Sequence, residues 1–505
     1  MLIERIGSDN LEGVDELPDK MKPPPSQRPT EVVTPPESSE EVRLLLAQVV
    51  SIMVASTLPE CFRAYLDDLI NILRTLAMDP FGEVIKEACA AIQELCTTGT
   101  ELLFHFTVII CRSLLLALVH KHAKVRMAGL DALQQGLYCG VWKYNVDVFE
   151  ILVGFRDPNL VPIRDFFEAT TRVNYLAMFV VDHSTVVREH FYKTVAHWLT
   201  KLPDKRDHEG RIFPYMLSAL NDEHEPIQQM AFELIEEMGE LYEEEEEEKL
   251  REYKQFGYHE VWTQEGRMSH LPLPFPFLHR PRIGSRHLVR SYVRRYLKAL
   301  YKELTDWIEK NRERAALLLL NCIAYSEDYM TQYLDHLLVA LYKVVLEADN
   351  PIVMQRIPIC LKLLGRFCTP ESYGTLMLQA VRSELAAHIP FTQLGAVKSV
   401  GYVLRGTIET IVPGDDLRRV EPFLQEFFTS VRDHILPPLD FELAGALVTS
   451  IEQIVEELLS KKRSDGVDVG ALTVHEWAIF EVLVRAMGVF NVFRISGKAE
   501  SDAVL

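Results

Sequence analysis

The chain has 505 residues, of which 48% are hydrophobic and 25% are charged, so it can bury a substantial core and is not disordered throughout. Acidic residues outnumber basic ones by 73 to 53, which gives a formal net charge of -20 at pH 7. This excess of carboxylates argues against general binding to nucleic acid, which requires clustered Lys and Arg. At about 100–200 residues per domain, the length allows three domains or one elongated assembly.

Hydropathy and cysteine usage indicate the compartment. No apolar run reaches the ~18 residues of a membrane span, and residues 1–13 lack the basic start and apolar run of a secretory leader. The eight cysteines stand singly, without a Cys-x-x-Cys pair, and most lie among aliphatic residues. We therefore expect a cytoplasmic protein with reduced thiols and no membrane contact.

The N-terminal residues 1–39 differ in composition from the rest. Prolines interrupt a polar run that has neither a helical nor a strand period, so we expect a disordered, Pro-rich tail. Ser39, followed by Glu40 and Glu41, has the features of a helix N-terminus, a capping residue before acids.

A repeated apolar stripe dominates the remainder. Residues at offsets 4, 7, 8 and 11 from an anchor are apolar in run after run, which places them on one face of a three-turn helix. Four gaps between anchors are 40 or 41 residues long. These gaps separate Val84 from Val125, Val187 from Ile227, Arg312 from Val353, and Val353 from Gln393. A period of ~40–47 residues with two helices per unit is typical of HEAT or armadillo repeats.

The turns before the anchored helices agree with this period. They contain helix-capping Asp, Asn or Ser, often with Pro, as in Asp79-Pro80 and Asp349-Asn350-Pro351, and an Arg follows the anchor in Val125-Arg126. We predict an all-α fold, a right-handed α-solenoid of HEAT/armadillo-like helical hairpins. An irregular all-helical domain is the alternative.

The repeats are expected in two blocks, at residues 40–241 and 286–505. The first block contains a loop insertion near 154–172, and an acidic and Pro/aromatic insertion at 242–285 separates the blocks.

The acidic part of the second insertion is a run of six Glu from Glu243 to Glu248. It is interpreted as a solvated helix extension, as a docking strip for a basic partner, or as one half of an internal clamp. The other half of the clamp would be a basic helix face carrying Arg286, Arg290 and Arg294 at four-residue spacing. Exposed pairs of this kind contribute only ~0.2–1 kcal/mol each. The candidate protein-binding residues here are Glu243, Glu244, Glu245, Glu246, Arg286, Arg290 and Arg294.

Between the two charge blocks, residues 271–277 alternate Pro with aliphatic and aromatic residues. Such a segment is stiff and extended. It either packs back onto the helices or presents Phe275 and Phe277 to a partner as a short linear motif.

The sequence contains no recognisable motif of an enzyme active site. We find no phosphate-binding Gly loop, no His-Glu-x-x-His and no Gly-x-Ser-x-Gly. His183, His190 and His197 fall seven residues apart, which is ~10.5 Å of helix rise and too far for one metal ion. No catalytic, cofactor-binding or metal-binding residue is predicted, and we expect a non-enzymatic protein.

Several stretches resemble one known family. They are residues 58–91, 118–126, 154–159, 173–177, 198–199, 202–204, 207–211 and 254–258. Together they resemble the dynein axonemal assembly factor 5 family, HEAT-repeat proteins of motile cilia, over roughly residues 58 to 460. The family has no catalytic motif, so the resemblance transfers no functional residue.

The resemblance implies a cytoplasmic scaffold required to preassemble outer and inner axonemal dynein arms. It implies axonemal dynein chains, chaperones and other dynein assembly factors as partners, and neither nucleic acid nor membrane. The alternatives are a general HEAT-repeat adaptor of the transport-receptor or phosphatase-scaffold type, and an enzyme with an unrecognised site.

Overall fold

The structure is a computed structural model of the whole chain. It describes residues 36–143, 146–154, 173–248, 250, 271–347, 349–382, 392–410, 420–434, 445–446, 449–454 and 456–457. The chain divides into two compact units, Met1–Met238 and Gly239–Leu505. Most of the predicted tail, residues 155–172 of the first insertion and residues 251–270 of the second lie outside the described residues.

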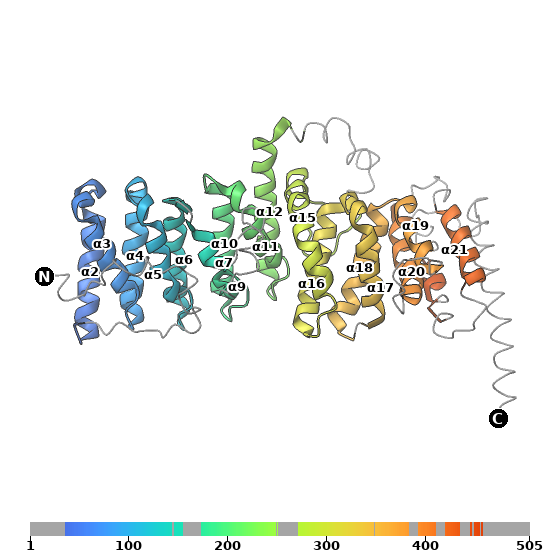
Figure 1. Cartoon of the computed structure of the whole chain (residues 1–505), viewed down its shortest axis with the longest axis horizontal. Coiled ribbons are helices and arrows are strands. Elements are labelled where there is room, and N and C mark those ends of the chain that lie inside the picture. The colour runs from blue at the N-terminus through green and yellow to red at the C-terminus, as the bar shows by residue number, and fades with distance from the viewer. Residues whose placement is uncertain are drawn as a thin grey trace, which may run out of the picture. The chain divides into compact units, whose positions relative to one another are not determined.

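The first unit is built from helices that follow one another in antiparallel pairs (Figure 1). Its α-helices are α2 (Glu40–Ser56), α3 (Leu66–Ala77), α4 (Gly82–Thr98), α5 (Thr107–Leu118), α6 (Ala123–Tyr138), α7 (Val148–Val153), α9 (Tyr175–Val180), α10 (Thr185–Lys201) and α11 (Lys205–Ala219). Helix α12 (Glu225–Glu245) runs across the boundary between the units. Short 3-10 helices lie at Pro59–Tyr65 (η2), Thr100–Leu102 (η3) and Phe104–Phe106 (η4).

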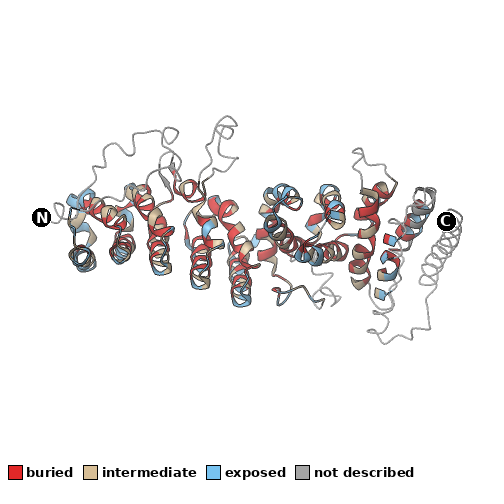
Figure 2. Ribbon diagram, turned by 90° about the horizontal axis from the view of Figure 1, so that it is seen from below, coloured by how far each residue is buried: buried red, intermediate tan, exposed pale blue. Residues whose placement is uncertain are grey.

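Two predicted local features are confirmed in this unit. Helix α2 begins at Glu40, and the side chain of Ser39 accepts a hydrogen bond from the Val42 N–H, as a capping residue does. The stripe that starts at Val84 on α4 is buried at all five positions. Figure 2 shows that buried residues follow one side of the helices. For α4, apolar periodicity therefore identified both the helix and the side that it buries.

The hairpins stack through their second helices. Helix α4 packs against α3 of its own hairpin and against α2 and α6 before and after it, and α6 packs likewise against α5, α4 and α10. Between α6 and α7, Trp142–Lys143 (β1) and Val146–Asp147 (β2) form a two-residue antiparallel ladder. This small hairpin is the exception to an otherwise helical unit among the described residues.

Arginine–aspartate pairs join consecutive hairpins, which the sequence pattern did not predict. Arg188 on α10 donates two hydrogen bonds to Asp222, of 2.7 and 2.9 Å, in the turn before α12. The same Asp222 accepts from the backbone N–H of His224 and so shapes its own turn. Equivalent pairs are Arg43–Asp79 and Arg126–Asp182 in this unit and Arg312–Asp349 in the second. In the three turns of the first unit, the Asp also accepts from a backbone N–H two residues later, so it fixes its own loop and binds the preceding repeat. In the turn before α18, Asn350 accepts these backbone hydrogen bonds instead.

The second unit repeats the arrangement. Its elements are α15 (Ile283–Glu303), α16 (Glu309–Ser326), the 3-10 helix η5 (Glu327–Tyr333), α17 (Leu334–Glu347), α18 (Pro351–Phe367), α19 (Pro370–Val381), α20 (Thr392–Thr410) and α21 (Glu421–His434). Helix α18 packs against α16 and α20. A Cβ atom at Gly365 or Gly406 would overlap the backbone carbonyl oxygen of Val403 or Lys362 on the facing helix, so these glycines allow the closest approach of α18 and α20.

The predicted fold class is therefore confirmed: in its described residues, each unit is an all-α stack of HEAT-like hairpins, and the first unit adds one two-residue ladder. Asn350 caps α18 by accepting from the Ile352 and Val353 N–H groups, as its turn sequence indicates. The precise repeat blocks and the handedness of the solenoid stay predictions. In the described part of the chain, no helix has both the length and the apolar composition to cross a bilayer.

Candidate protein-binding site

The acidic strip continues helix α12 to Glu245 and meets the start of α15. Glu243 is half-buried, and its carboxylate accepts hydrogen bonds from Arg282 at 3.2 Å and from the Gly284 N–H at 2.9 Å. A second carboxylate, that of Glu240, lies 3.3 Å from the Arg282 guanidinium. Glu244 and Glu245 are exposed, and Glu246 is half-buried. Glu240 and Glu243 thus form contacts within the protein, whereas Glu244 and Glu245 face solvent.

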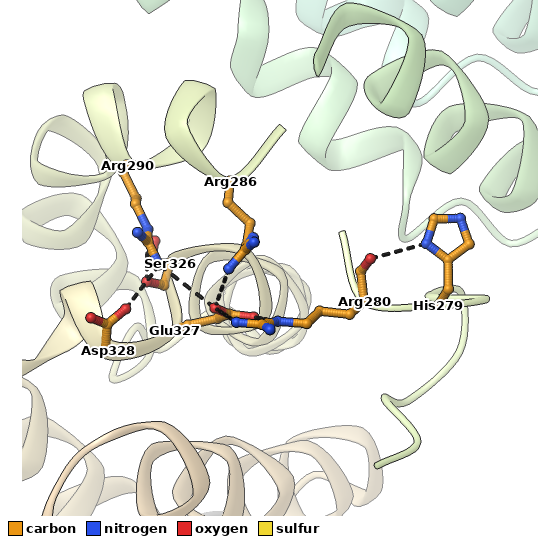
Figure 3. Close-up of polar contacts among 7 residues, drawn as sticks. All are labelled: His279, Arg280, Arg286, Arg290, Ser326, Glu327 and Asp328. Carbon is orange, nitrogen blue, oxygen red and sulfur yellow. Dashed lines mark hydrogen bonds and ion pairs between the residues drawn. The ribbon is translucent and has the colours of Figure 1, made fainter. Parts of the chain in front are cut away.

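Arg286 and Arg290 on α15 converge on η5 (Figure 3). Arg286 contacts the Glu327 carboxylate at 2.7 Å, and Arg290 contacts Asp328 at 2.9 Å. Arg290 also donates to the Ser326 carbonyl oxygen at 3.0 Å, which lies at the end of α16. The two arginines therefore join the first helix of this hairpin to the segment that follows the second.

Glu327 is the centre of the cluster. Arg280, which lies in the segment before α15, donates to both of its carboxylate oxygens, at 2.7 and 2.8 Å. Only 2% of Glu327 is exposed, and its backbone has a φ of 51°, a conformation that costs energy for a residue with a Cβ. Burial would raise the pKa of Glu327, but Arg286, Arg280 and Arg290 outweigh it and lower the pKa to about 2. The three arginines therefore hold Glu327 in its ionised form and join it to α15 and to the segment before that helix.

The Pro/aromatic segment packs onto the second unit. The Phe277 ring is 5% exposed and meets Tyr325 of α16 edge-on, with ring centroids 5.2 Å apart. The Pro272 carbonyl oxygen accepts a hydrogen bond of 3.0 Å from Arg366 on α18. Phe275 is 42% exposed. Of the two interpretations of this segment, packing back onto the helices is confirmed for its described residues.

The expectation of a single exposed basic face is wrong for two of its three arginines. Arg286 and Arg290 are buried, and only Arg294 is exposed. The contact between the acidic strip and the basic helix forms through Arg282, outside the predicted trio. Phe277 is buried as well. The candidate residues that are exposed to solvent are Glu244, Glu245, Phe275 and Arg294, and Glu243 and Glu246 are half-buried.

Sequence reasoning missed Glu327 altogether. Its one signal is its position: it is the first acid after the apolar stripe of α16, followed directly by Asp328. A single acid at a helix end is ordinarily solvated, so nothing local marks it as the partner of three arginines. Within the described ranges, no group of three or more His, Cys, Asp or Glu side chains is placed to hold a metal ion.

Two models of known families match most of these repeats. Residues 273–425 match the HEAT-repeat domain of dynein axonemal assembly factor 5. Residues 25–153 and 168–253 match the model for dynein axonemal assembly factor 5-like TPR repeats. The chain belongs to the dynein axonemal assembly factor 5 family. The second match includes the acidic strip, and the first includes Phe275 and the Arg–Glu327 cluster. The residues of the candidate site therefore lie in the parts of the chain that match this family.

Curated members of this family are considerably longer than this chain. The dynein axonemal assembly factor 5 proteins of Xenopus laevis and Homo sapiens are each 27% identical to it. Both alignments cover 70% of this chain, but only 38% of the frog protein and 37% of the human protein. Among solved structures, a crystal structure of importin beta aligns over 90% of this chain and 56% of its own, with 13% identity and a TM-score of 0.30. A TM-score this low does not establish a shared overall fold.

Proposed function

We propose that this chain is a non-enzymatic, cytoplasmic scaffold for the preassembly of outer and inner axonemal dynein arms. Membership of the dynein axonemal assembly factor 5 family carries this proposal. The stacked hairpins support the scaffold role, because solenoids offer long, continuous surfaces on which large partners are held side by side. Its partners are axonemal dynein chains, chaperones and other assembly factors.

The exposed part of the second insertion is the proposed partner contact. Glu244 and Glu245 give it carboxylates, Phe275 gives it a half-exposed ring, and Arg294 gives it a cation. The Arg–Glu327 cluster supports this contact indirectly, because it fixes the segment 271–282 that carries Phe275. Aromatic and Arg side chains are the types that most often dominate binding energy at interfaces.

Deletion of the gene in a motile ciliated cell tests the function. Electron microscopy of axonemes should show loss of outer and inner dynein arms, and re-expression of residues 1–505 should restore them. Intact arms with normal beating in the deletion strain would contradict the proposal.

Two variants then test the contact. Phe275→Ala combined with Arg294→Glu should reduce recovery of dynein heavy chains by affinity purification, while the protein keeps its thermal stability because both side chains are exposed. Arg314→Glu, a charge reversal of an exposed arginine elsewhere in the unit, is the matched control. Equal recovery with both proteins would place the partner elsewhere.

A further inference from the structure

The C-terminal half of α15 has an exposed basic face. Its members are four exposed cations, Arg294, Arg295, Lys298 and Lys302. At about 100° of rotation per residue, they fall within an arc of about 100° around the helix axis. The one acid of this helix, Glu303, lies about 80° beyond the edge of that arc. The basic face therefore contains no carboxylate from its own helix.

Other cations of this unit are paired with acids of neighbouring elements, at distances of 2.6 to 3.1 Å. Such pairs are Arg366–Glu409, Arg382–Glu426 and Arg405–Glu457. In the described part of the chain, by contrast, no carboxylate forms an ion pair with Arg294, Lys298 or Lys302. Burial and the neighbouring Asp306 raise the pKa of Glu303, so the cations of the basic face do not neutralise this acid either.

The helix dipole explains only part of this face. Cations in the last turn of a helix are favoured by its unpaired carbonyl groups, and the effect falls off within that turn. Lys302 lies in the last turn of α15, which ends at Glu303. Arg294 and Arg295 lie about two turns earlier, where the dipole gives no reason for a cation.

Aromatic side chains border the basic face. The Arg295 guanidinium lies over the half-buried Tyr292 ring, 5.4 Å from its centroid. Just beyond the end of α15, in the turn before α16, Trp307 is 87% exposed. Arg312 donates a hydrogen bond of 3.2 Å to the Trp307 carbonyl oxygen, so the backbone of this turn is held while the ring faces solvent. Trp, Tyr and Arg are the residues most enriched at the energetic centres of protein interfaces.

We propose that the basic face of α15 and Trp307 form a docking surface for an acidic segment of a partner protein. Residues 294–302 rise by about 12 Å along the helix axis, a length that about four residues of extended chain match. A segment of about four Asp or Glu residues would therefore reach all four cations, and an apolar residue beside them would pack on Trp307. The unpaired charges of the face set the chemistry of this occupant.

Acids around the face limit the occupant to a short segment. Burial and Asp335 of α17 raise the pKa of Tyr301 on α15, so Asp335 lies near this helix, and it is exposed. Glu303 and Glu309 are exposed on the side of the turn. A nucleic acid or an anionic bilayer would meet these carboxylates as well, whereas a short segment follows the cations alone.

A labelled peptide of four Glu followed by two Leu is the probe, titrated with the full chain by fluorescence anisotropy. Binding should saturate and should weaken as salt is added, because salt screens exposed charges. Lys298→Glu combined with Lys302→Glu should weaken it by at least about tenfold, and Trp307→Ala by at least about threefold. Lys121→Glu combined with Lys124→Glu, at two exposed lysines of the first unit, makes the same change in net charge. This control should change binding by less than about twofold.

Circular dichroism melting checks that each variant is folded, and Lys298→Gln combined with Lys302→Gln is a milder second variant. The proposal fails if the peptide does not bind, or if the control weakens binding as much as the variants of the face. Tighter binding to oligothymidine, or to vesicles that contain phosphatidylserine, would overturn it if the same variants abolish that binding. It also fails if sedimentation shows a dimer that the Lys298 and Lys302 variants dissolve, since a second copy then covers the face.

This proposal does not rest on the role in dynein-arm assembly. The proposed partner contact shares only Arg294 with the basic face, and the variants used here leave Arg294 intact. The peptide contains no dynein sequence, so either proposal can fail while the other stands.

Discussion

The Glu327 cluster gives the sharpest prediction about this fold. Glu327→Gln preserves the shape of the side chain and removes its charge, which leaves Arg280 and Arg286 without their shared counter-charge. The pKa of Glu327 is about 2, against 4.5 for the free side chain, a difference that corresponds to about 3 kcal/mol of stabilisation at neutral pH. Removing one partner of a buried ion pair costs a similar amount, ~3–5 kcal/mol.

Hydrogen exchange measures this loss where it occurs, because global unfolding of a chain with two units is not a two-state process. Amides of η5 and of the first turns of α15 should exchange roughly 150-fold faster in Glu327→Gln, the rate change that about 3 kcal/mol produces. Glu244→Gln, an exposed carboxylate on the acidic strip, is the matched control and should leave these amides unchanged. An increase below about threefold in Glu327→Gln would refute the assignment of the cluster as the anchor of α15 and of the segment before it.

Acid titration checks the same reasoning independently. Because folding lowers the pKa of Glu327, its contribution is complete above the unfolded pKa of 4.5 and is lost as pH falls toward about 2. The difference in local stability between the wild type and Glu327→Gln should therefore be constant near neutral pH and shrink between about pH 4.5 and 2. If the difference in local stability between the two proteins stays constant down to pH 2, the charge of the Glu327 carboxylate is not the cause of that difference.

Three further substitutions, Gly406→Ala, Arg188→Met and Phe277→Ala, test the packing, and Gly136→Ala and Phe275→Ala are controls for the first and the last. Gly406→Ala should cost about 1–3 kcal/mol of stability, because α18 and α20 must separate to make room for the added methyl group. The thermal midpoint of unfolding should fall accordingly. Gly136→Ala, where the nearest atom is 3.5 Å away, should be neutral or stabilising by up to about 1 kcal/mol. Arg188→Met should cost about 3 kcal/mol of local stability, since it leaves the buried Asp222 without its ionic partner, so amides of the turn before α12 should exchange roughly 150-fold faster. An increase below about fivefold would show that the pair is dispensable. Phe277→Ala should make residues 271–282 sensitive to limited proteolysis, whereas Phe275→Ala should not, because only the first ring is buried.

Local features of the fold could be predicted because they depend on neighbours in the sequence. The start of α2 follows from the Ser39 cap and the acids after it. The buried stripe of α4 follows from helical periodicity alone. The turn before α18 follows from Asn350 and Pro351, which a helix N-terminus favours. Each of these signals lies within a few residues of the structure that it specifies.

The candidate site was predicted only in part, and helix geometry explains why. Residues four apart on a helix with 3.6 residues per turn are rotated by about 40° from each other, so Arg286 and Arg294 point about 80° apart. The first therefore lies in the core and the second in solvent, although the sequence shows an even series. Which of them is buried depends on η5, about forty residues later, and no local pattern indicates that contact.

The sequence by itself determined that this protein is helical, that its helices bury one face at a period near 40 residues, and that its charge is concentrated around one insertion. Those properties follow from side-chain hydropathy and local backbone preferences. Only the tertiary structure decided which charges are structural and which are exposed, and that Asp222 binds the preceding repeat. These depend on contacts between residues 34 to 47 positions apart, where burial and ion pairing are set by packing between helices.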